Sequence, residues 1–137
     1  MRELVVAGIA VDQESGGPVL LLRAQEEKDR FVPLRIGEAE AVSIMIGLRG
    51  DATPRPLTHD LLMHVLSALE ASLEGVSLDR LEEGICYASL HIRRASGDTV
   101  QVDARPSDSV ALAIRTGSPI FITEEVYEAL VQELPGF

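Results

Sequence analysis

The chain has 137 residues, of which 46% are hydrophobic, and this is enough to bury the aliphatic core of one domain. Its net charge of −10 and its pI of about 4.6 exclude an extended basic surface for holding nucleic acid. No apolar run reaches the ~18 residues needed to cross a bilayer, and the amino terminus lacks a signal-peptide pattern, so we expect a cytoplasmic protein without a membrane segment.

The first half of the chain is expected to form three strands followed by two helices. Alternating apolar residues indicate the strands, and apolar residues at helical spacing indicate the helices. In chain order these elements are Leu4–Val11, Val19–Arg23, Arg30–Ile36, Glu38–Leu48 and His59–Ala71. The second helix should begin at an N-cap, Thr58, and should bury one apolar face. That face consists of Leu61, Leu62, Val65, Leu66 and Leu69.

The second half of the chain repeats this plan. Its expected strands, first helix and short extended segment are Val76–Leu81, Ile85–Arg93, Thr99–Ala104, Pro106–Thr116 and Ser118–Ile122. Pro106 at the start of that helix and Gly117 after its end are typical helix boundaries. A last helix should be capped by Thr123 and run through Leu134.

Two segments of the chain read alike when they are aligned at an offset of 68 residues. In both, a strand pattern changes to a helix pattern at the same point, with Glu40 or Asp108 in the first helical turn. We therefore predict an α+β fold with a duplicated β-β-β-α-α unit, its halves spanning about residues 1–72 and 73–137. Hairpin-linked strands followed by helices favour a largely antiparallel or mixed sheet, covered by helices, in a single compact domain.

Well-known catalytic and cofactor signatures are absent from the sequence. It contains no HExxH, no P-loop, no Rossmann glycine fingerprint and no GxSxG elbow, so no organic cofactor is expected. The single cysteine, Cys86, excludes an internal disulfide and is expected to be a small buried residue on a strand. His59 and His64 are five residues apart on one helix and cannot share a metal ion, and His91 is expected at a surface or edge.

Three polar clusters stand at helix starts: 37–40, 55–60 and 103–109. Helix capping explains any one acid in them, because a carboxylate in a first turn stabilises the helix by about 0.3–1 kcal/mol. Capping does not explain why acids, arginines and a histidine gather at three helix starts in so short a chain. Helix N-termini bind anions such as phosphate, and Arg55 and Arg105, next to prolines, would add guanidinium groups beside them.

A paired-carboxylate site is the chemistry that this pattern favours. If the two halves pack about a pseudo-two-fold axis, Glu40 and Asp108 occupy equivalent positions and could approach each other. Paired carboxylates can hold Mg²⁺ or Mn²⁺, which can activate water for phosphodiester hydrolysis. The predicted metal ligands are Glu38, Glu40, Asp103 and Asp108.

The same clusters resemble the bifunctional nuclease domain family, which occurs in bacteria and in plants. The resemblance lies in residues 32–41, 54–61 and 102–113, in matching order, and extends over roughly residues 4–126. One departure is Arg35, where many members have a tryptophan. The resemblance implies nuclease activity on DNA and RNA. By position it implies these candidate residues: Glu38, Glu40, Arg55, His59, Asp60, Asp103, Arg105 and Asp108.

The first functional hypothesis is a nuclease that hydrolyses phosphodiester bonds of RNA or DNA, assisted by Mg²⁺ or Mn²⁺. Its predicted catalytic residues are Glu40, His59, Asp60 and Asp108, with His59 as general acid or base. Arg55 and Arg105 would bind the substrate phosphate. RNA or DNA would then bind at a local site.

The second hypothesis is a non-enzymatic regulatory or interaction module, in which the charged helix starts are structural ion pairs and caps. A sensor of small anions or nucleotides is a third reading, because helix N-termini suit both. We also expect a homodimer, because two-fold assemblies are the most frequent oligomers.

Overall fold

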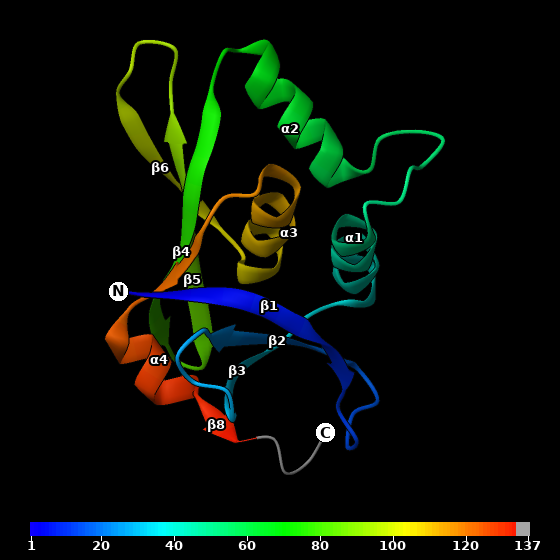
Figure 1. The fold of residues 1–137 in the computed structure, drawn as a ribbon, viewed down its shortest axis with the longest axis vertical. Helices are drawn as coiled ribbons and strands as arrows, with labels where there is room; N and C mark the ends of the chain where they lie inside the picture. The colour runs from blue at the N-terminus through cyan, green and yellow to red at the C-terminus, as the bar shows by residue number, and fades with distance from the viewer. Residues whose placement is uncertain (134–137) are drawn as a thin grey trace.

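The computed structural model describes residues 1–133, which form one eight-stranded sheet and four helices (Figure 1). The strands are β1 (Arg2–Val11), β2 (Pro18–Ala24), β3 (Arg30–Arg35), β4 (Ser72–Glu82), β5 (Ile85–Arg93), β6 (Thr99–Ala104), β7 (Ile120–Ile122) and β8 (Gln132–Glu133). The helices are α1 (Glu38–Arg49), α2 (Thr58–Ala68), α3 (Pro106–Thr116) and α4 (Glu124–Leu130).

The sheet has the strand order β6-β5-β4-β7-β1-β2-β3-β8. Two antiparallel meanders, β1–β2–β3 and β4–β5–β6, stand on either side of β7. β7 pairs antiparallel with β1 and parallel with β4. The predicted α+β fold with a largely antiparallel, mixed sheet is confirmed.

The helices α1, α2 and α3 lie together on one side of the sheet, and α4 lies apart from them near β8 (Figure 1). α3 packs on β4 and β5, and both α1 and α2 pack on α3. α3 is accordingly the most deeply buried helix, with Val110, Ala111, Leu112 and Ala113 at 1% exposure or less. Ile44 of α1 completes this contact, so the helix starts of α1 and α3 are fixed relative to each other by core packing.

Both halves of the chain keep the predicted order of three strands and a helix, but they differ afterwards. α1 is followed by a loop and the long helix α2, whereas α3 is followed by β7 before the short helix α4. β7 forms because Ile120 and Ile122 are buried and alternate with a half-buried residue, which fits a strand between two others. The common origin of the two halves stays a prediction.

Four helix ends differ from the prediction: α1 ends one residue later, at Arg49, α2 ends at Ala68 in place of Ala71, and the start of α2 and the end of α4 also differ. α2 begins one residue earlier than expected, with Leu57 as its N-cap in place of Thr58, because the Asp60 carboxylate accepts a hydrogen bond from the Leu57 N–H. α4 ends at Leu130, because the chain then turns extended and residues 132–133 pair with β3. Leu134, the predicted end of that helix, lies outside the described residues. The predicted N-cap of α4, Thr123, is confirmed, since the Thr123 hydroxyl accepts a hydrogen bond from the Val126 N–H.

The predicted buried face of α2 is wrong for most of its residues. Leu61, Leu62, Val65 and Leu69 are 55%, 43%, 45% and 68% exposed, and only Leu66 of the predicted face packs in part against the core. The reason is that α3 already covers the sheet beneath, so the apolar contacts of α2 with the body come from Met63 and Leu66, beside the buried His59. α2 therefore presents an apolar surface outward.

None of the helices within residues 1–133 combines the length and the apolar character required to span a bilayer. Cys86 lies on a strand, β5, as predicted, but it is half-buried in place of the expected full burial. His91 is half-buried on the same strand, and its Nε2 lies 2.8 Å from the buried Ser77 hydroxyl.

We predict that Gly117→Ala destabilises the fold by about 1 kcal/mol, because Gly117 ends α3 in the left-handed region at φ 67°. The control is Gly17→Ala, where an added Cβ meets only an ordinary contact 3.5 Å from Ser15 Oγ. Urea unfolding of both variants measures the difference. Equal stabilities would contradict the left-handed C-cap.

Candidate functional site

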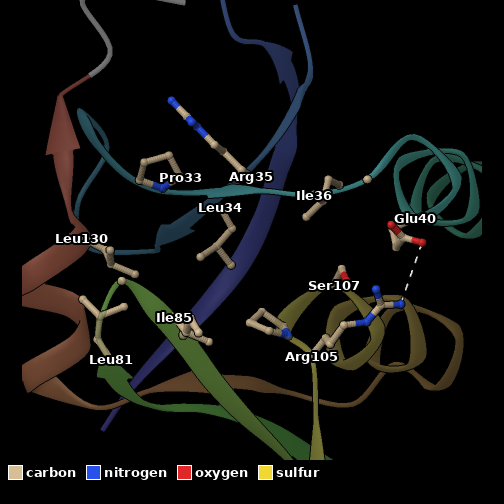
Figure 2. A pocket seen from close by; sticks show the side chains of 14 residues that line it. Pro33, Leu34, Arg35, Ile36, Glu40, Leu81, Ile85, Arg105, Ser107 and Leu130 are labelled. Atoms are coloured by element: carbon tan, nitrogen blue, oxygen red, sulfur yellow. Dashed lines mark ion pairs between the residues drawn. The ribbon is translucent and has the colours of Figure 1, made fainter. Parts of the chain in front are cut away.

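The starts of α1 and α3 meet beside the sheet and bring two carboxylates to one arginine. Arg105 is the N-cap of α3, and its Nε donates to Asp108 Oδ2 at 2.9 Å. Its guanidinium also lies 3.9 Å from Glu40 Oε2 of α1, the ion pair drawn in Figure 2. The two acids that the sequence pairs through its repeat therefore both contact Arg105.

A groove of about 540 Å³ opens beside this ion pair (Figure 2). Its walls come from β3 and the start of α1, from the β4–β5 hairpin, from the start of α3 and from the end of α4. Most of the lining is aliphatic, and the polar groups gather toward α1 and α3. The charged residues on the lining are Arg35, Glu40 and Arg105.

Behind Asp108, a buried hydrogen-bond chain runs from α3 through α2 to α1. His59 of α2 is 7% exposed, and its Nε2 lies 2.8 Å from Asp108 Oδ1. Its Nδ1 lies 2.6 Å from the hydroxyl of Ser43 in α1. Because a carboxylate only accepts, His59 Nε2 carries a proton and donates to Asp108, and in the neutral imidazole Nδ1 accepts from Ser43.

Arg115, near the end of α3, closes the network from the other side. Its Nε donates to Asp60 Oδ1 at 2.7 Å, and its Nη2 donates to the Ser43 carbonyl and hydroxyl, both at 3.1 Å. The Arg115 side chain is only 9% exposed. One arginine therefore ties α3 to both α1 and α2.

Two carboxylates of this network stay ionised at neutral pH. Burial alone would raise the pKa of Asp108, but hydrogen bonds from Arg105 and His59 outweigh it and hold that pKa below its ordinary value. The hydrogen bond from Arg115, followed by the one from the Leu57 N–H, lowers the pKa of Asp60. In contrast, burial raises the pKa of the Cys86 thiol in the groove to about 11, so it is protonated at neutral pH and is no nucleophile.

Ser43, His59 and Asp108 have the composition of a hydrolase triad but not its accessibility. Ser43 is 7% exposed, and its hydroxyl accepts from Arg115 while it donates to His59. In a nucleophilic triad the serine must face the substrate. This serine faces the helix interface, so its hydroxyl is not a nucleophile. The hydrogen bonds of Ser43 and His59 instead hold Asp108 in position.

The structure does not bring every predicted site residue to this place. Glu38 is exposed and, two positions before Glu40, points to another side of α1. Asp103 lies on the sheet face opposite to Ala104, whose strand partner Ala88 is in the core. Arg55 is exposed in the loop before α2 and does not line the groove.

Asp60 binds Arg115 and caps α2, on the far side of His59 from the groove. Of the predicted metal ligands, only Glu40 and Asp108 therefore share a contact, and it is Arg105. Across residues 1–133, no group of three or more His, Cys, Asp or Glu side chains is arranged to hold a metal ion.

Two residues of the site were not found from the sequence: Ser43 and Arg115. Ser43 carries a weak signal, since it is a small polar residue next to Ile44 in the apolar middle of α1. Arg115 in a last helical turn reads as a residue that complements the helix dipole. Its partners, Asp60 and Ser43, are separated from it by 55 and 72 positions in the sequence, so no local pattern indicates these contacts.

Comparisons with known proteins point to one family. The family model described as "Bifunctional nuclease domain" matches residues 20–134. An uncharacterized protein of Mycobacterium tuberculosis is 46% identical over 126 residues, which cover 92% of this chain and 74% of that protein.

Two proteins of Oryza sativa subsp. japonica are more distant relatives. Bifunctional nuclease 1 is 19% identical over 109 residues, which cover 78% of this chain and 33% of that protein. Bifunctional nuclease 2 is 23% identical over 116 residues, with 82% and 35% covered. This chain therefore matches only about a third of the length of either rice protein.

We predict that Arg115→Ala lowers the free energy of unfolding by about 3 kcal/mol, because it leaves Asp60 and the Ser43 carbonyl without their buried partner. The matched control is Arg94→Ala, whose ion pair with Asp98 is exposed and should contribute less than about 0.5 kcal/mol. Chemical denaturation measures both. A loss no larger than that of the control would show that the Arg115 contacts do not hold the helices.

The lowered pKa of Asp60 predicts a pH-dependent effect. The ionised carboxylate stabilises the fold above its unfolded pKa of about 3.9, and this contribution is lost as the pH falls through the lower pKa of the folded state. Asp60→Asn should therefore cost about 1 kcal/mol at neutral pH, and the difference from wild type should shrink below about pH 4. Asp103→Asn, which removes no ion pair within residues 1–133, is the control. A difference that is independent of pH would contradict the assignment.

Proposed function

The chain belongs to the bifunctional nuclease domain family, and from this membership we propose that it hydrolyses phosphodiester bonds of RNA or DNA in the groove beside Arg105. The observation that carries the proposal is the meeting of Glu40 and Asp108 on one solvent-exposed arginine at the groove wall. Family membership supplies the reaction class, and the groove supplies the place.

Arg105 would bind the phosphate in this groove, and its side chain is 66% exposed. Arg35 also lines the groove, but its guanidinium is ion-paired with Asp12 at 3.0 Å and points away from Arg105 (Figure 2). Guanidinium groups bind phosphate oxygens in a bidentate way, and a developing negative charge in the transition state strengthens these bonds. In a chain of net charge −10, such a local cation is what a polyanion requires in order to bind.

Glu40 and Asp108 are the acids available for proton transfer or for holding a cation. Mg²⁺ is often bound by one or two carboxylates, with waters and substrate phosphates as its remaining ligands. These two side chains fit that pattern, provided that the Arg105 guanidinium turns from them to the substrate. A bound Mg²⁺ or Mn²⁺ would lower the pKa of water and stabilise negative charge on the phosphate.

His59 would act through Asp108 and would not touch the substrate. Both of its ring nitrogens are hydrogen-bonded within the protein, and it is buried. It keeps one Asp108 oxygen directed toward α2, while Arg105 holds the other. His59 is therefore proposed as a positioning residue, together with Ser43.

The aliphatic part of the groove would take a base or sugar. A volume of about 540 Å³ is within the range of pockets for small ligands, and so has room for one unpaired nucleotide. The lining contains no aromatic side chain, so a base would rest on aliphatic groups such as Ile36 and Ile85 without a ring to stack on. Weak dependence on base identity follows.

One observation favours the alternative of a non-enzymatic interaction module. Asp60, His59 and Arg115 are already engaged in bonds that hold the helices together, as a structural role requires. The exposed apolar side chains of α2 are what an interaction module would present. The activity of the purified protein separates the two functions.

We expect the wild type to hydrolyse single-stranded RNA or DNA oligonucleotides in the presence of Mg²⁺ or Mn²⁺, and EDTA to abolish the hydrolysis. Glu40→Gln, Asp108→Asn and Arg105→Ala should each lower kcat/KM by about 100-fold. Each removes a group that would activate the attacking water or stabilise the negative charge on the phosphate in the transition state. Gel-resolved cleavage of end-labelled oligonucleotides gives the rates. Thermal melting of every variant separates loss of folding from loss of chemistry.

The controls are Glu128→Gln and Arg49→Ala, which make the same changes of charge at exposed positions away from the groove. Both should keep the wild-type rate. A folded wild type that cleaves neither nucleic acid with either cation would remove the proposed function. Cleavage that survives all three groove substitutions would place the chemistry elsewhere, and cleavage in EDTA would remove the cation from the proposal.

A further inference from the structure

We propose that the start of α3 is an anion-binding site, in which the Ser107 hydroxyl and the N–H groups of Ser107 and Asp108 bind a non-bridging oxygen of a phosphodiester. Ser107 lines the groove beside Arg105, on the side that faces the start of α1 (Figure 2). This role rests on the proposed function, which supplies the phosphodiester. It adds a substrate-binding residue and a preference for phosphates within a strand.

Ser107 is a buried residue whose hydroxyl has no partner in the described part of the chain. The residue is 6% exposed, yet within residues 1–133 its hydroxyl forms no hydrogen bond and stays open to the groove. Ser109 of the same helix is 0% exposed, and its hydroxyl donates to the Arg105 carbonyl at 3.0 Å. Because buried polar groups without a partner are rare in folded proteins, the free Ser107 hydroxyl indicates an acceptor that binds in the groove. No base contacts this hydroxyl, so it is a donor and not an activated nucleophile.

The backbone at the start of α3 offers two further donors. Its N-cap provides no side-chain bond and its first residue is a proline, so the N–H groups of Ser107 and Asp108 have no partner within residues 1–133. In α2, the acid at the same helical position, Asp60, folds back and accepts from the N-cap N–H. The Asp108 carboxylate is bound to His59 and Arg105 instead. The start of α3 is therefore uncapped.

The other helix start in the groove, that of α1, is already occupied by an acid of its own. The Glu40 carboxylate lies directly against the Gly37 backbone, in the space that a side chain at Gly37 would need. A carboxylate at this place satisfies the positive end of the helix dipole and repels a second anion. Of the two helix starts that line the groove, only that of α3 is therefore free to bind an anion.

The charges around Ser107 favour a phosphate with a single negative charge. Arg105 contributes one positive charge, and Glu40 and Asp108, which contact it, contribute two negative charges. A phosphodiester within a strand carries one negative charge, whereas a terminal phosphate carries nearly two at neutral pH. The hydroxyl and the N–H groups are neutral donors and do not compensate the additional charge. We therefore expect binding of internal phosphodiesters, and with it cleavage within a strand.

An NMR titration of the isotope-labelled full chain in EDTA tests the site without requiring hydrolysis. The probes are thymidylyl-thymidine, which has a single phosphodiester, and thymidine monophosphate. The amide signals of Ser107 and Asp108 should shift with the dinucleotide, which should bind at least about tenfold more tightly than the monophosphate. Ser107→Ala should weaken binding of the dinucleotide by about tenfold, because a hydrogen bond to a charged group is lost.

The matched control is Ser109→Ala, which removes a hydroxyl that is bonded inside the protein. This control should lower the melting temperature and keep the affinity for the dinucleotide. Ser107→Ala should show the opposite, a lower affinity with an unchanged melting temperature, because the hydroxyl that it removes has no protein partner to lose within residues 1–133. Ser107→Cys keeps a side chain of similar size with a weak donor, and should lose affinity as the alanine variant does.

The outcomes for this site and for the proposed nuclease function are distinguishable. Amide signals at the start of α3 that do not move, or binding that Ser107→Ala does not weaken, would overturn the site even if the chain cleaves nucleic acid. Tighter binding of the monophosphate would overturn the preference for phosphodiesters. Binding at Ser107 by a chain that hydrolyses no oligonucleotide would support the site and remove only the proposed hydrolysis.

Discussion

Two arginines at opposite ends of α3 hold the three packed helices in their relative positions. Arg115, almost fully buried, binds Asp60 of α2 and both oxygens of Ser43 in α1. Arg105, mostly exposed, reaches Asp108 of its own helix and Glu40 of α1. Ordinary apolar packing would let α1 and α2 slide on α3, whereas directional bonds to charged groups fix one arrangement.

The two arginines differ in exposure, and this difference indicates different roles. A buried guanidinium must keep its partners, because a charge without them would be very unfavourable inside the protein. Arg115 is therefore committed to the fold. Arg105 stands in solvent at a groove, where its bonds to acids can be exchanged for bonds to an incoming anion at small cost. The His59–Ser43 chain connects the two ends and transmits the position of α2 to Asp108.

Much of the architecture could be predicted from local patterns. Strand alternation located the first six strands, and the proline and glycine at the ends of α3 located that helix to the residue. The sequence placed Glu40 and Asp108 at equivalent helix starts and predicted that they could approach each other, and the structure brings both to Arg105. The predicted roles of Glu38, Asp103 and Arg55 had no such support. Each stands in a polar motif, but side-chain direction along a helix or strand decides which face it joins.

The sequence by itself determined the elements, the family and the two helix starts that carry acids, because these depend on neighbours within a few residues. Only the tertiary structure decided that α3 shields the sheet from α2, which turned a predicted buried leucine face outward. It likewise decided that Arg115 and Ser43 join His59, since partners as far as 72 positions apart meet only after the core has formed. An amphipathic pattern specifies that a face is apolar, and the packing of other elements specifies whether the chain itself covers it.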